Sequence, residues 1–262
     1  MQLDEGTAIE PWELLAERGG ALSIETTFAR RLWLGPSAGT VRRRSGTLSR
    51  RALVIGDPTG DLPAAKAEAA QVEALLRESK AFPAGVVSLI GPRQATAGRV
   101  SDALAGGGVD LLHYAGHALA TEDTGGLALA DDRLRPDTLA AAVTTPVIVV
   151  ANACSTGEIA AEEGPRRATF VTSLTRAGVD IFLGCAWPVG DVQARTFSQA
   201  FYGKLLGGEA VGVAVNAGRR AIQTQLMDPW DPYWAAYVLY GNPWYRLVEP
   251  PAPPPYLTAA SG

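Results

Sequence analysis

The sequence predicts an α/β fold in which a mostly parallel central sheet is flanked by helices on both faces. Short apolar runs closed by Gly, Pro, Asp or other turn residues recur along residues 51–189, as strands do. Segments with apolar residues at helical spacing separate these runs. The runs are apolar throughout rather than alternating, which indicates strands covered on both faces, as in a parallel sheet.

The predicted strands share an apolar run and a closing turn, and they cover residues 51–58, 84–92, 109–117, 144–155 and 179–189. The predicted helices share an Ala- or Leu-rich composition and helical spacing, and they cover residues 62–80, 96–108, 168–178, 191–208 and 209–225. Residues 125–143 predict a small hairpin and then a helix opened by Pro136. Residues 233–247 predict a last strand or a helical turn.

The two ends of the chain differ from this regular pattern. Residues 1–50 are expected to form an N-terminal extension that packs on the main domain, or the end of an upstream part. Within it, residues 11–20 predict a short helix and residues 21–34 a strand or hairpin. The main domain is expected to cover residues 51–248, and the proline-rich residues 249–262 a flexible tail.

Composition narrows the function classes. A net charge of −4 and a pI of about 5.3 leave no general basic footprint for nucleic acid, and the arginine-rich residues 41–51 are better explained as a solvated loop than as a phosphate site. The acidic, mixed N-terminus is unlike a signal peptide, and no run of about 18 apolar residues predicts a membrane span. Two cysteines make no disulfide framework, so a reducing, cytoplasmic setting is expected.

Sites in parallel sheets lie beyond the carboxyl ends of the strands, which directs attention to the strand exits. Both histidines belong to "LLHYAGH". His113 lies inside the apolar run and is expected to be a hydrogen-bonded core residue, whereas His117 lies at the exit and is a candidate for acid–base chemistry. Their spacing falls on a strand, lacks the Glu of the helical zinc motif and has no third histidine, so no metal site is expected.

The cysteines also differ in context. Cys185 lies inside "IFLGCAWP" and fits a small buried apolar residue, whereas Cys154 lies at a strand exit in "NACSTGE". Backbone N–H groups at such an exit can lower a thiol pKa and bind an oxyanion. If the strands of His117 and Cys154 are parallel neighbours, both residues leave the sheet at the same edge, which predicts a Cys–His dyad.

Several motifs together carry a resemblance to a known family. "LLHYAGH", "ANACSTGE" and "AGVDIFLGCAWPVGD", with "ALVIGDPTGDLPAAKAEAAQVEALL" before them and "WAAYVLYGNP" after them, occur in this order. The sequence resembles the CHAT family of caspase-like (clan CD) cysteine peptidases over nearly its whole length. The resemblance implies a caspase-like fold and a cysteine endopeptidase.

The resemblance also implies a role for particular residues. Cys154 would be the nucleophile on a peptide carbonyl, and His117 would protonate the leaving amine. Caspase-like sites require no Asp or Asn as a third member. The oxyanion hole would come from the backbone N–H groups of Cys154 and Ala118. The family commonly has Gly where this sequence has Ala118. Alanine still supplies an N–H group, but it lacks the freedom of Gly to adopt positive φ.

The substrate pocket is less specified. Candidate substrate-binding residues are Asp57, Asn152, Trp187 and Asp191. For the aspartates, including Asp61, a turn or helix-cap role is the favoured explanation. If any of these acids line the pocket, it would reject an aspartate of the substrate and accept a basic residue. If none of them does, a neutral or apolar substrate residue is expected.

The resulting hypothesis is a regulated cysteine endopeptidase that cleaves a partner protein in bacterial signalling or antiviral defence. It would need no cofactor, no nucleic acid and no membrane, and a sensor or helical-repeat module or protein would activate it. The alternative is a catalytically inactive caspase-like binding scaffold. The presence of Ala118 where the family commonly has Gly slightly favours this alternative. A different Cys-dependent hydrolase or glutaminase would need a G-x-C-x-G elbow and a later histidine, and the sequence has neither.

Overall fold

The computed structural model describes residues 1–3, 10–17, 20–32, 50–119, 125–142, 145–153, 164–226 and 231–248. Cys154, most of the arginine-rich stretch and the proline-rich tail lie outside the described residues. Among the helices in the described ranges, none combines the length and the apolar character that crossing a membrane requires.

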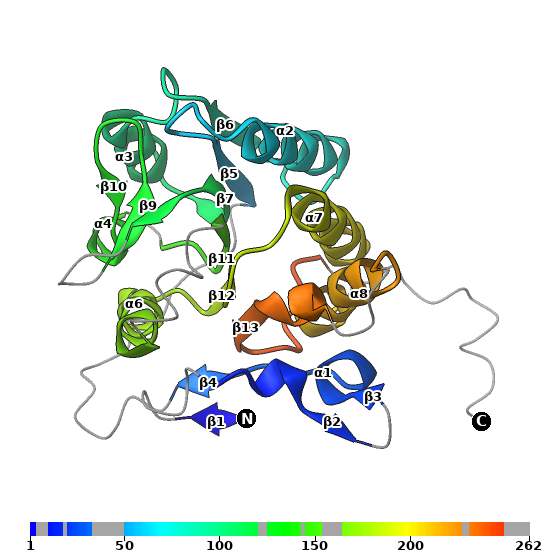
Figure 1. Cartoon of the computed structure of the whole chain (residues 1–262). Coiled ribbons are helices and arrows are strands. Elements are labelled where there is room, and N and C mark those ends of the chain that lie inside the picture. The colour runs from blue at the N-terminus through cyan, green and yellow to red at the C-terminus, as the bar shows by residue number, and fades with distance from the viewer. Residues whose placement is uncertain are drawn as a thin grey trace, which may run out of the picture.

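A six-stranded sheet forms the centre of the molecule, in the order β13-β12-β11-β7-β5-β6 (Figure 1). Its strands are β5 (Arg51–Gly56), β6 (Val86–Ile90), β7 (Val109–Gly116), β11 (Ile148–Ala153), β12 (Ile181–Cys185) and β13 (Tyr237–Gly241). All neighbours pair in parallel except β12 and β13, which are antiparallel. The mostly parallel sheet predicted from the sequence is therefore confirmed, and each predicted strand from residue 51 to residue 189 contains one of these strands.

Helices cover both faces of the sheet (Figure 1). One layer contains α2 (Pro63–Glu78), α7 (Asp191–Leu206) and α8 (Val211–Gln223), and the other contains α3 (Ala97–Ala105), α4 (Pro136–Ala140) and α6 (Gly164–Ala177). Successive residues of β5 alternate between the layers, with Val54 in the first core and Leu53 and Ile55 in the second. This two-sided burial explains the continuous apolar runs of the sequence.

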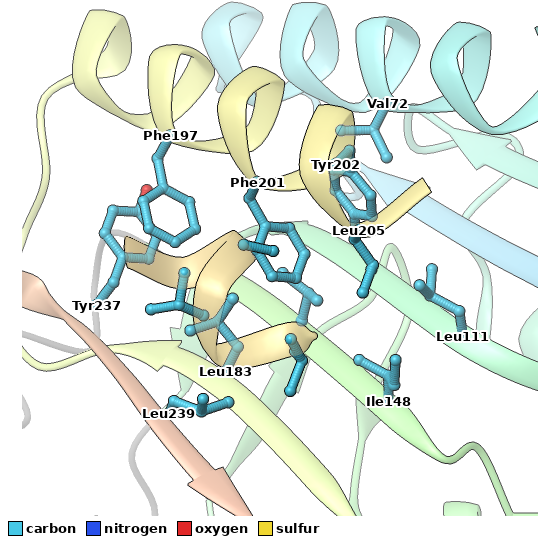
Figure 2. Close-up of a cluster of buried hydrophobic side chains, with 14 of the residues drawn as sticks. Val72, Leu111, Ile148, Leu183, Phe197, Phe201, Tyr202, Leu205, Tyr237 and Leu239 are labelled. Atoms are coloured by element: carbon cyan, nitrogen blue, oxygen red, sulfur yellow. The ribbon is translucent and has the colours of Figure 1, made fainter. Parts of the chain in front are cut away.

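The larger core lies under α7 (Figure 2). Aromatic side chains of this helix, including Phe197 and Phe201, reach down toward aliphatic residues of the sheet such as Leu183 and Ile148. The Phe197 ring stacks on that of Tyr237, with centroids 3.4 Å apart and planes 2° apart. This packing fixes α7, whose first turn borders the strand exits.

The segment before the sheet packs on β13 and α8 (Figure 1). Arg30 extends the sheet at its β13 edge, because its N–H donates to Leu239 O at 2.8 Å and its carbonyl accepts from Gly241 N at 2.9 Å. The short elements of this N-terminal segment are β1 (Gln2–Leu3), η2 (Trp12–Leu14), β2 (Ala16–Glu17), β3 (Gly20–Ala21), α1 (Leu22–Glu25) and β4 (Arg31–Leu32).

The helix predicted for residues 11–20 is wrong. The chain forms the short 3-10 turn η2 there, and β2 and β3 then pair as a hairpin. The reason is tertiary: Leu14 and Leu15, which suggest a buried helix face, are 41% and 44% exposed, and the buried residue is Glu13. Residues 21–34 contain one helical turn, α1, and the short strand β4.

A small antiparallel sheet follows the exit of β7. It consists of β8 (Ala118–Leu119), β9 (Gly126–Ala128) and β10 (Arg133–Leu134), in the order β10-β9-β8. The predicted hairpin and the helix opened by Pro136 are therefore confirmed. Before β13 lies the 3-10 helix η3 (Pro232–Ala236), so the last predicted segment contains both a helical turn and a strand.

Candidate active site

Two neighbouring strands end in register at the edge where the site was predicted. β7 and β11 are parallel partners, and their last residues, Gly116 and Ala153, face each other. His117 and Cys154 are the residues that come directly after this pair. The arrangement that the sequence analysis made a condition of the dyad, parallel neighbouring strands, is therefore present, although the Cys154 side chain lies outside the described residues.

His117 is held at its backbone and contacts a carboxylate with its ring. Its carbonyl oxygen lies 2.6 Å from the Tyr114 hydroxyl and accepts from the Ala128 N–H at 2.9 Å. The imidazole is 30% exposed, and its Nε2 lies 3.2 Å from each carboxylate oxygen of Asp61. Hydrogen bonds to its backbone carbonyl therefore hold His117 at the exit of β7, and Asp61 contacts its ring.

The residue before His117 must be glycine. A Cβ at Gly116 would lie 2.6 Å from the Tyr114 hydroxyl and 2.9 Å from the ring carbon that carries it, closer than Cβ atoms approach other atoms, and it would also lie 3.0 Å from a ring carbon of Pro58. The same close approach brings the loop after β5 against the exit of β7. This loop carries Asp61, so the glycine of "YAGH" allows the contact between Asp61 and His117.

The loop after β5 contains two aspartates with different roles. Asp57 is 4% exposed, has a φ of 45°, and accepts the Leu62 N–H at 2.9 Å, so its carboxylate closes its own turn. Asp61 is 63% exposed and accepts a hydrogen bond from the Thr59 hydroxyl. That bond first, and the contact with His117 second, hold the pKa of Asp61 below its usual value. Asp61 is therefore an anion beside the histidine.

A pocket lies beside the two strand exits. Its cavity volume is about 20 Å³, room for about one water molecule. Its lining consists of Leu62, Ala64, Ala65, Glu68, Gly116, Asn152, Asp191 and Ala194. The lining comes from the start of α2, the exits of β7 and β11, and the first turn of α7. Two of the residues predicted to bind substrate, Asn152 and Asp191, therefore lie on one pocket, and Asp57 is not among its lining residues.

One of the lining residues is a buried carboxyl. Glu68 of α2 is 3% exposed, and its Oε1 accepts from Asn152 Nδ2 at 2.9 Å and from the Ser198 hydroxyl at 2.7 Å. Burial raises the pKa of Glu68 to about 7, against the lowering effect of these two hydrogen bonds. The carboxyl thus changes charge near neutral pH, which is unusual for a glutamate.

Further polar side chains surround this carboxyl. The Asn152 oxygen accepts from the Tyr237 hydroxyl and from the Cys185 thiol, each at 3.3 Å, so Asn152 is held at both ends of its amide. His113 is fully buried, as predicted for a core histidine, and its Nδ1 lies 3.1 Å from the Tyr202 hydroxyl. Its Nε2 lies 3.5 Å from Glu68, but burial lowers the pKa of His113 to about 3, so the contact is not an ion pair at neutral pH.

The remaining predicted site residues lie near the pocket. Asp191 is the exposed first residue of α7. Trp187 is half-buried against the core, and its Nε1 finds no hydrogen-bond partner within the described part of the chain. Ala118 begins β8 opposite Leu127. Among described residues other than glycine, only Arg50 and Asp57 have positive φ, so the backbone at Ala118 does not need glycine.

Three features of the site are absent from the sequence prediction: Glu68, Ser198 and the contact of Asp61 with His117. A signal for Glu68 exists, because it lies four residues before Val72 on the buried face of its helix, where a charged residue is unexpected. No metal cluster is present either: the described residues contain no group of three His, Cys, Asp or Glu side chains placed to hold an ion.

Comparisons with known proteins identify the family and the fold of the chain. A model of the CHAT domain matches residues 4–242, a range that includes most of the segment before the sheet. The fold is similar to that of the Arg-specific cysteine proteinase gingipain R. The TM-score is 0.61 at 15% identity, and the match covers 82% of this chain and 54% of that chain. A complex of the Porphyromonas gingivalis pro- and mature domains is also similar. The fold is also similar to separase in the Saccharomyces cerevisiae separase–securin complex, with a TM-score of 0.56 at 14% identity, over 91% of this chain and 15% of that one.

The chain therefore spans about half of gingipain R and a small part of separase. No curated protein sequence matches it. The likeness to these structures establishes the caspase-like fold, and the match to the family model covers most of the sequence. The chain belongs to the CHAT-domain family, with the fold of caspase-like cysteine peptidases.

Proposed function

We propose that the chain is a cysteine endopeptidase that uses Cys154 as nucleophile and His117 as general acid and base. The observation that carries this proposal is the register of β7 and β11, whose paired last residues directly precede His117 and Cys154. In a parallel pair, neighbouring strands lie about 4.8 Å apart, so the chain enters both loops side by side. Side chains that leave the sheet side by side can reach the hydrogen-bond distance, about 2.6–3.2 Å, at which a nucleophile and a base exchange a proton.

The reaction would proceed in two steps. The Cys154 thiolate attacks the peptide carbonyl carbon, and the oxyanion accepts hydrogen bonds from the backbone N–H groups of Cys154 and Ala118. The C–N bond then breaks as His117 donates a proton to the leaving amine, which leaves a thioester on Cys154. In the second step a water molecule gives its proton to His117 and attacks the thioester, which releases the acid and the thiol.

Asp61 would act as a positioning residue for His117. The resemblance implies a site without a third member, whereas the structure places both carboxylate oxygens of Asp61 3.2 Å from His117 Nε2. An acceptor at Nε2 fixes the ring orientation and leaves Nδ1 for the proton that moves in the reaction. It also stabilises the imidazolium that forms when the thiol is deprotonated.

The substrate would be a protein, as it is for a peptidase of this fold class. Gingipain R is Arg-specific by its description, and separase is solved with securin, so protein recognition is common to both similar structures. We place the activity in bacterial signalling or defence, in the cytoplasm, under the control of a sensor or helical-repeat partner. The inactive-scaffold alternative loses its support from Ala118, because the backbone there does not require glycine.

A thiol-directed peptidyl inhibitor tests this proposal. The chain should be incubated with peptidyl acyloxymethyl ketones and mapped by mass spectrometry, with Cys185→Ser as the matched control. Cys185 is 3% exposed and donates to Asn152, and serine keeps a donor there. We expect labelling on Cys154 in the wild type and in Cys185→Ser, and a large loss in His117→Ala. Equal labelling rates in the wild type and His117→Ala would contradict the dyad.

A further inference from the structure

We propose that Tyr114 is a positioning residue for the oxyanion hole. Its hydroxyl holds the carbonyl of His117 and thereby aims and polarises the Ala118 N–H, which belongs to the same peptide group. This inference rests on the proposed peptidase function and adds to it a buried residue that the reaction steps given above do not use.

Tyr114 carries its hydroxyl to the backbone of its own loop. Its side chain is fully buried, in the smaller of the two cores that flank the sheet. The hydroxyl oxygen lies 2.6 Å from His117 O and 3.0 Å from Ala128 O. A hydroxyl has one proton to donate, and the shorter contact assigns that proton to His117. Burial raises the pKa of Tyr114 above its usual value, so the hydroxyl keeps this proton at neutral pH.

Gly116 leaves the room that this contact needs. A Cβ at Gly116 would lie 2.6 Å from the Tyr114 hydroxyl, so the hydroxyl occupies the space that a side chain would enter. The chain can therefore turn back over the ring, and His117 O, three residues along the chain, reaches the hydroxyl. The hydrogen bond thus depends on the spacing of tyrosine, glycine and histidine in "YAGH".

The peptide group between His117 and Ala118 converts this bond into a constraint on the N–H. The peptide is trans, so its C=O and N–H point in opposite directions within one rigid plane. His117 O accepts the Ala128 N–H at 2.9 Å, so these two residues form a hydrogen-bonded pair. In an antiparallel ladder the next pair, Ala118 and Leu127, is then non-hydrogen-bonded, and the Ala118 N–H points away from β9. Because β8 is the edge strand of its sheet, this N–H is directed to the open edge.

Two donors on one carbonyl also strengthen the N–H on its other side. The Tyr114 hydroxyl and the Ala128 N–H both donate to His117 O. Hydrogen bonds that share a peptide group polarise one another, by about 10–30% per bond. An oxyanion donor that is fixed before the reaction needs no reorganisation when the charge develops. Tyr114 would therefore act on the transition state, whereas a residue that only fills the core would act on stability alone.

Tyr114→Phe removes the hydroxyl and keeps the ring, and it should fold because His117 O retains the Ala128 N–H. Loss of a direct oxyanion donor lowers kcat about 10²- to 10³-fold. We expect a smaller fall in kcat, about 5- to 20-fold, with KM unchanged, because Tyr114 acts only through the peptide. Alkylation of Cys154 by iodoacetamide displaces iodide and forms no oxyanion, so its rate should stay the same. The matched control is Tyr240→Phe, which removes another buried tyrosine hydroxyl, on β13, and should leave kcat unchanged.

An NMR measurement reads the peptide group without any catalysis. The chain has two histidines, and only His117 precedes an alanine. Labelling histidine carbonyls with carbon-13 and alanine amides with nitrogen-15 therefore gives a single HNCO peak, from the peptide between His117 and Ala118. We expect Tyr114→Phe to move the carbonyl and amide nitrogen resonances of this peak upfield, because the carbonyl loses a hydrogen bond. Tyr240→Phe should leave both resonances in place.

The two measurements separate the hydrogen bond from the peptidase. An unchanged carbonyl resonance or an unchanged kcat in Tyr114→Phe overturns the proposal. An iodoacetamide rate that falls as far as kcat also overturns it, because Tyr114 would then act on the thiolate of Cys154. If the wild type cleaves no peptide and His117→Ala does not slow alkylation, the proposed function fails and the oxyanion role fails with it. The HNCO peak still decides whether the hydrogen bond exists.

Discussion

Glu13 connects the N-terminal segment to the core, and its replacement by glutamine is the sharpest test of that connection. Its carboxylate is fully buried and accepts two hydrogen bonds from Arg30, of which that from Nε to Oε1 is 2.9 Å long. Arg219 of α8 lies 3.9 Å from the same carboxylate and is also fully buried. Burial lowers the pKa of Arg219 to about 10, and the Glu13 charge opposes that lowering.

The size of the effect follows from this arrangement. Glu13→Gln leaves two buried guanidinium groups around a neutral amide, and breaking a buried ion pair costs about 3–5 kcal/mol. The low end is expected, because the glutamine oxygen still accepts from Arg30, and Arg219 keeps its bonds to the carbonyls of Tyr237 and Ser23. A chain of this size loses about 2 °C of melting temperature per kcal/mol, so the midpoint should fall by about 6 °C.

Urea unfolding followed by tryptophan fluorescence measures this cost. The matched control is Glu25→Gln, in the same segment: Glu25 lies 3.9 Å from Arg220, and these side chains are 59% and 52% exposed. An exposed pair of this kind contributes at most about 1 kcal/mol. If Glu13→Gln costs no more than Glu25→Gln, the buried pair does not stabilise the chain, and the segment is not held on the domain as described here.

Other expected outcomes concern the site and the core. Asp61→Asn should lower kcat/KM about tenfold with an unchanged unfolding midpoint, much less than the roughly 10,000-fold loss at a buried catalytic aspartate, because Asp61 is 63% exposed; activity equal to the wild type would remove its positioning role. Gly218→Ala should cost about 1–3 kcal/mol in urea unfolding, because a Cβ there lies 2.5 Å from the Phe197 ring, whereas Gly203→Ala, with no atom within 4 Å, should be neutral or stabilising. Glu68 has a folded pKa of about 7 against 4.5 unfolded, so the folded state holds the extra proton between these values and its stabilisation is lost as pH rises. The unfolding free energy of the wild type relative to Glu68→Gln should therefore fall by about 3 kcal/mol from pH 4.5 to pH 7.5, and a flat or rising difference would contradict the buried carboxyl.

The sheet was predictable because its signals are local. Each apolar run with a closing turn became a strand, and both faces are covered, as the absence of alternation indicates. The N-terminal segment was not predictable in the same way. Leu14 and Leu15 are exposed and Glu13 is buried, because Glu13 forms an ion pair with Arg30. No local pattern in the sequence contains that partner.

The same distinction holds at the candidate site. The rule that sites lie at strand exits directed attention to His117 and Cys154, and the structure pairs Gly116 and Ala153, the residues directly before them. Glu68 was missed because one glutamate in an Ala- and Glu-rich helix resembles a solvated residue, and only α7 and β11 packed above it show that it is buried. Asp61 lies 56 residues from its partner His117, so the contact exists only through the fold.

Cleavage of an unbiased peptide library by the purified chain, read by mass spectrometry, tests the central claim most directly. It should be run for the wild type, Cys154→Ala, His117→Ala and the control Cys185→Ser. We predict a defined set of cleavages by the wild type and by Cys185→Ser, all of them absent with Cys154→Ala and reduced to a small fraction with His117→Ala. Cleavages that persist unchanged in Cys154→Ala would contradict the assignment of Cys154 as the nucleophile.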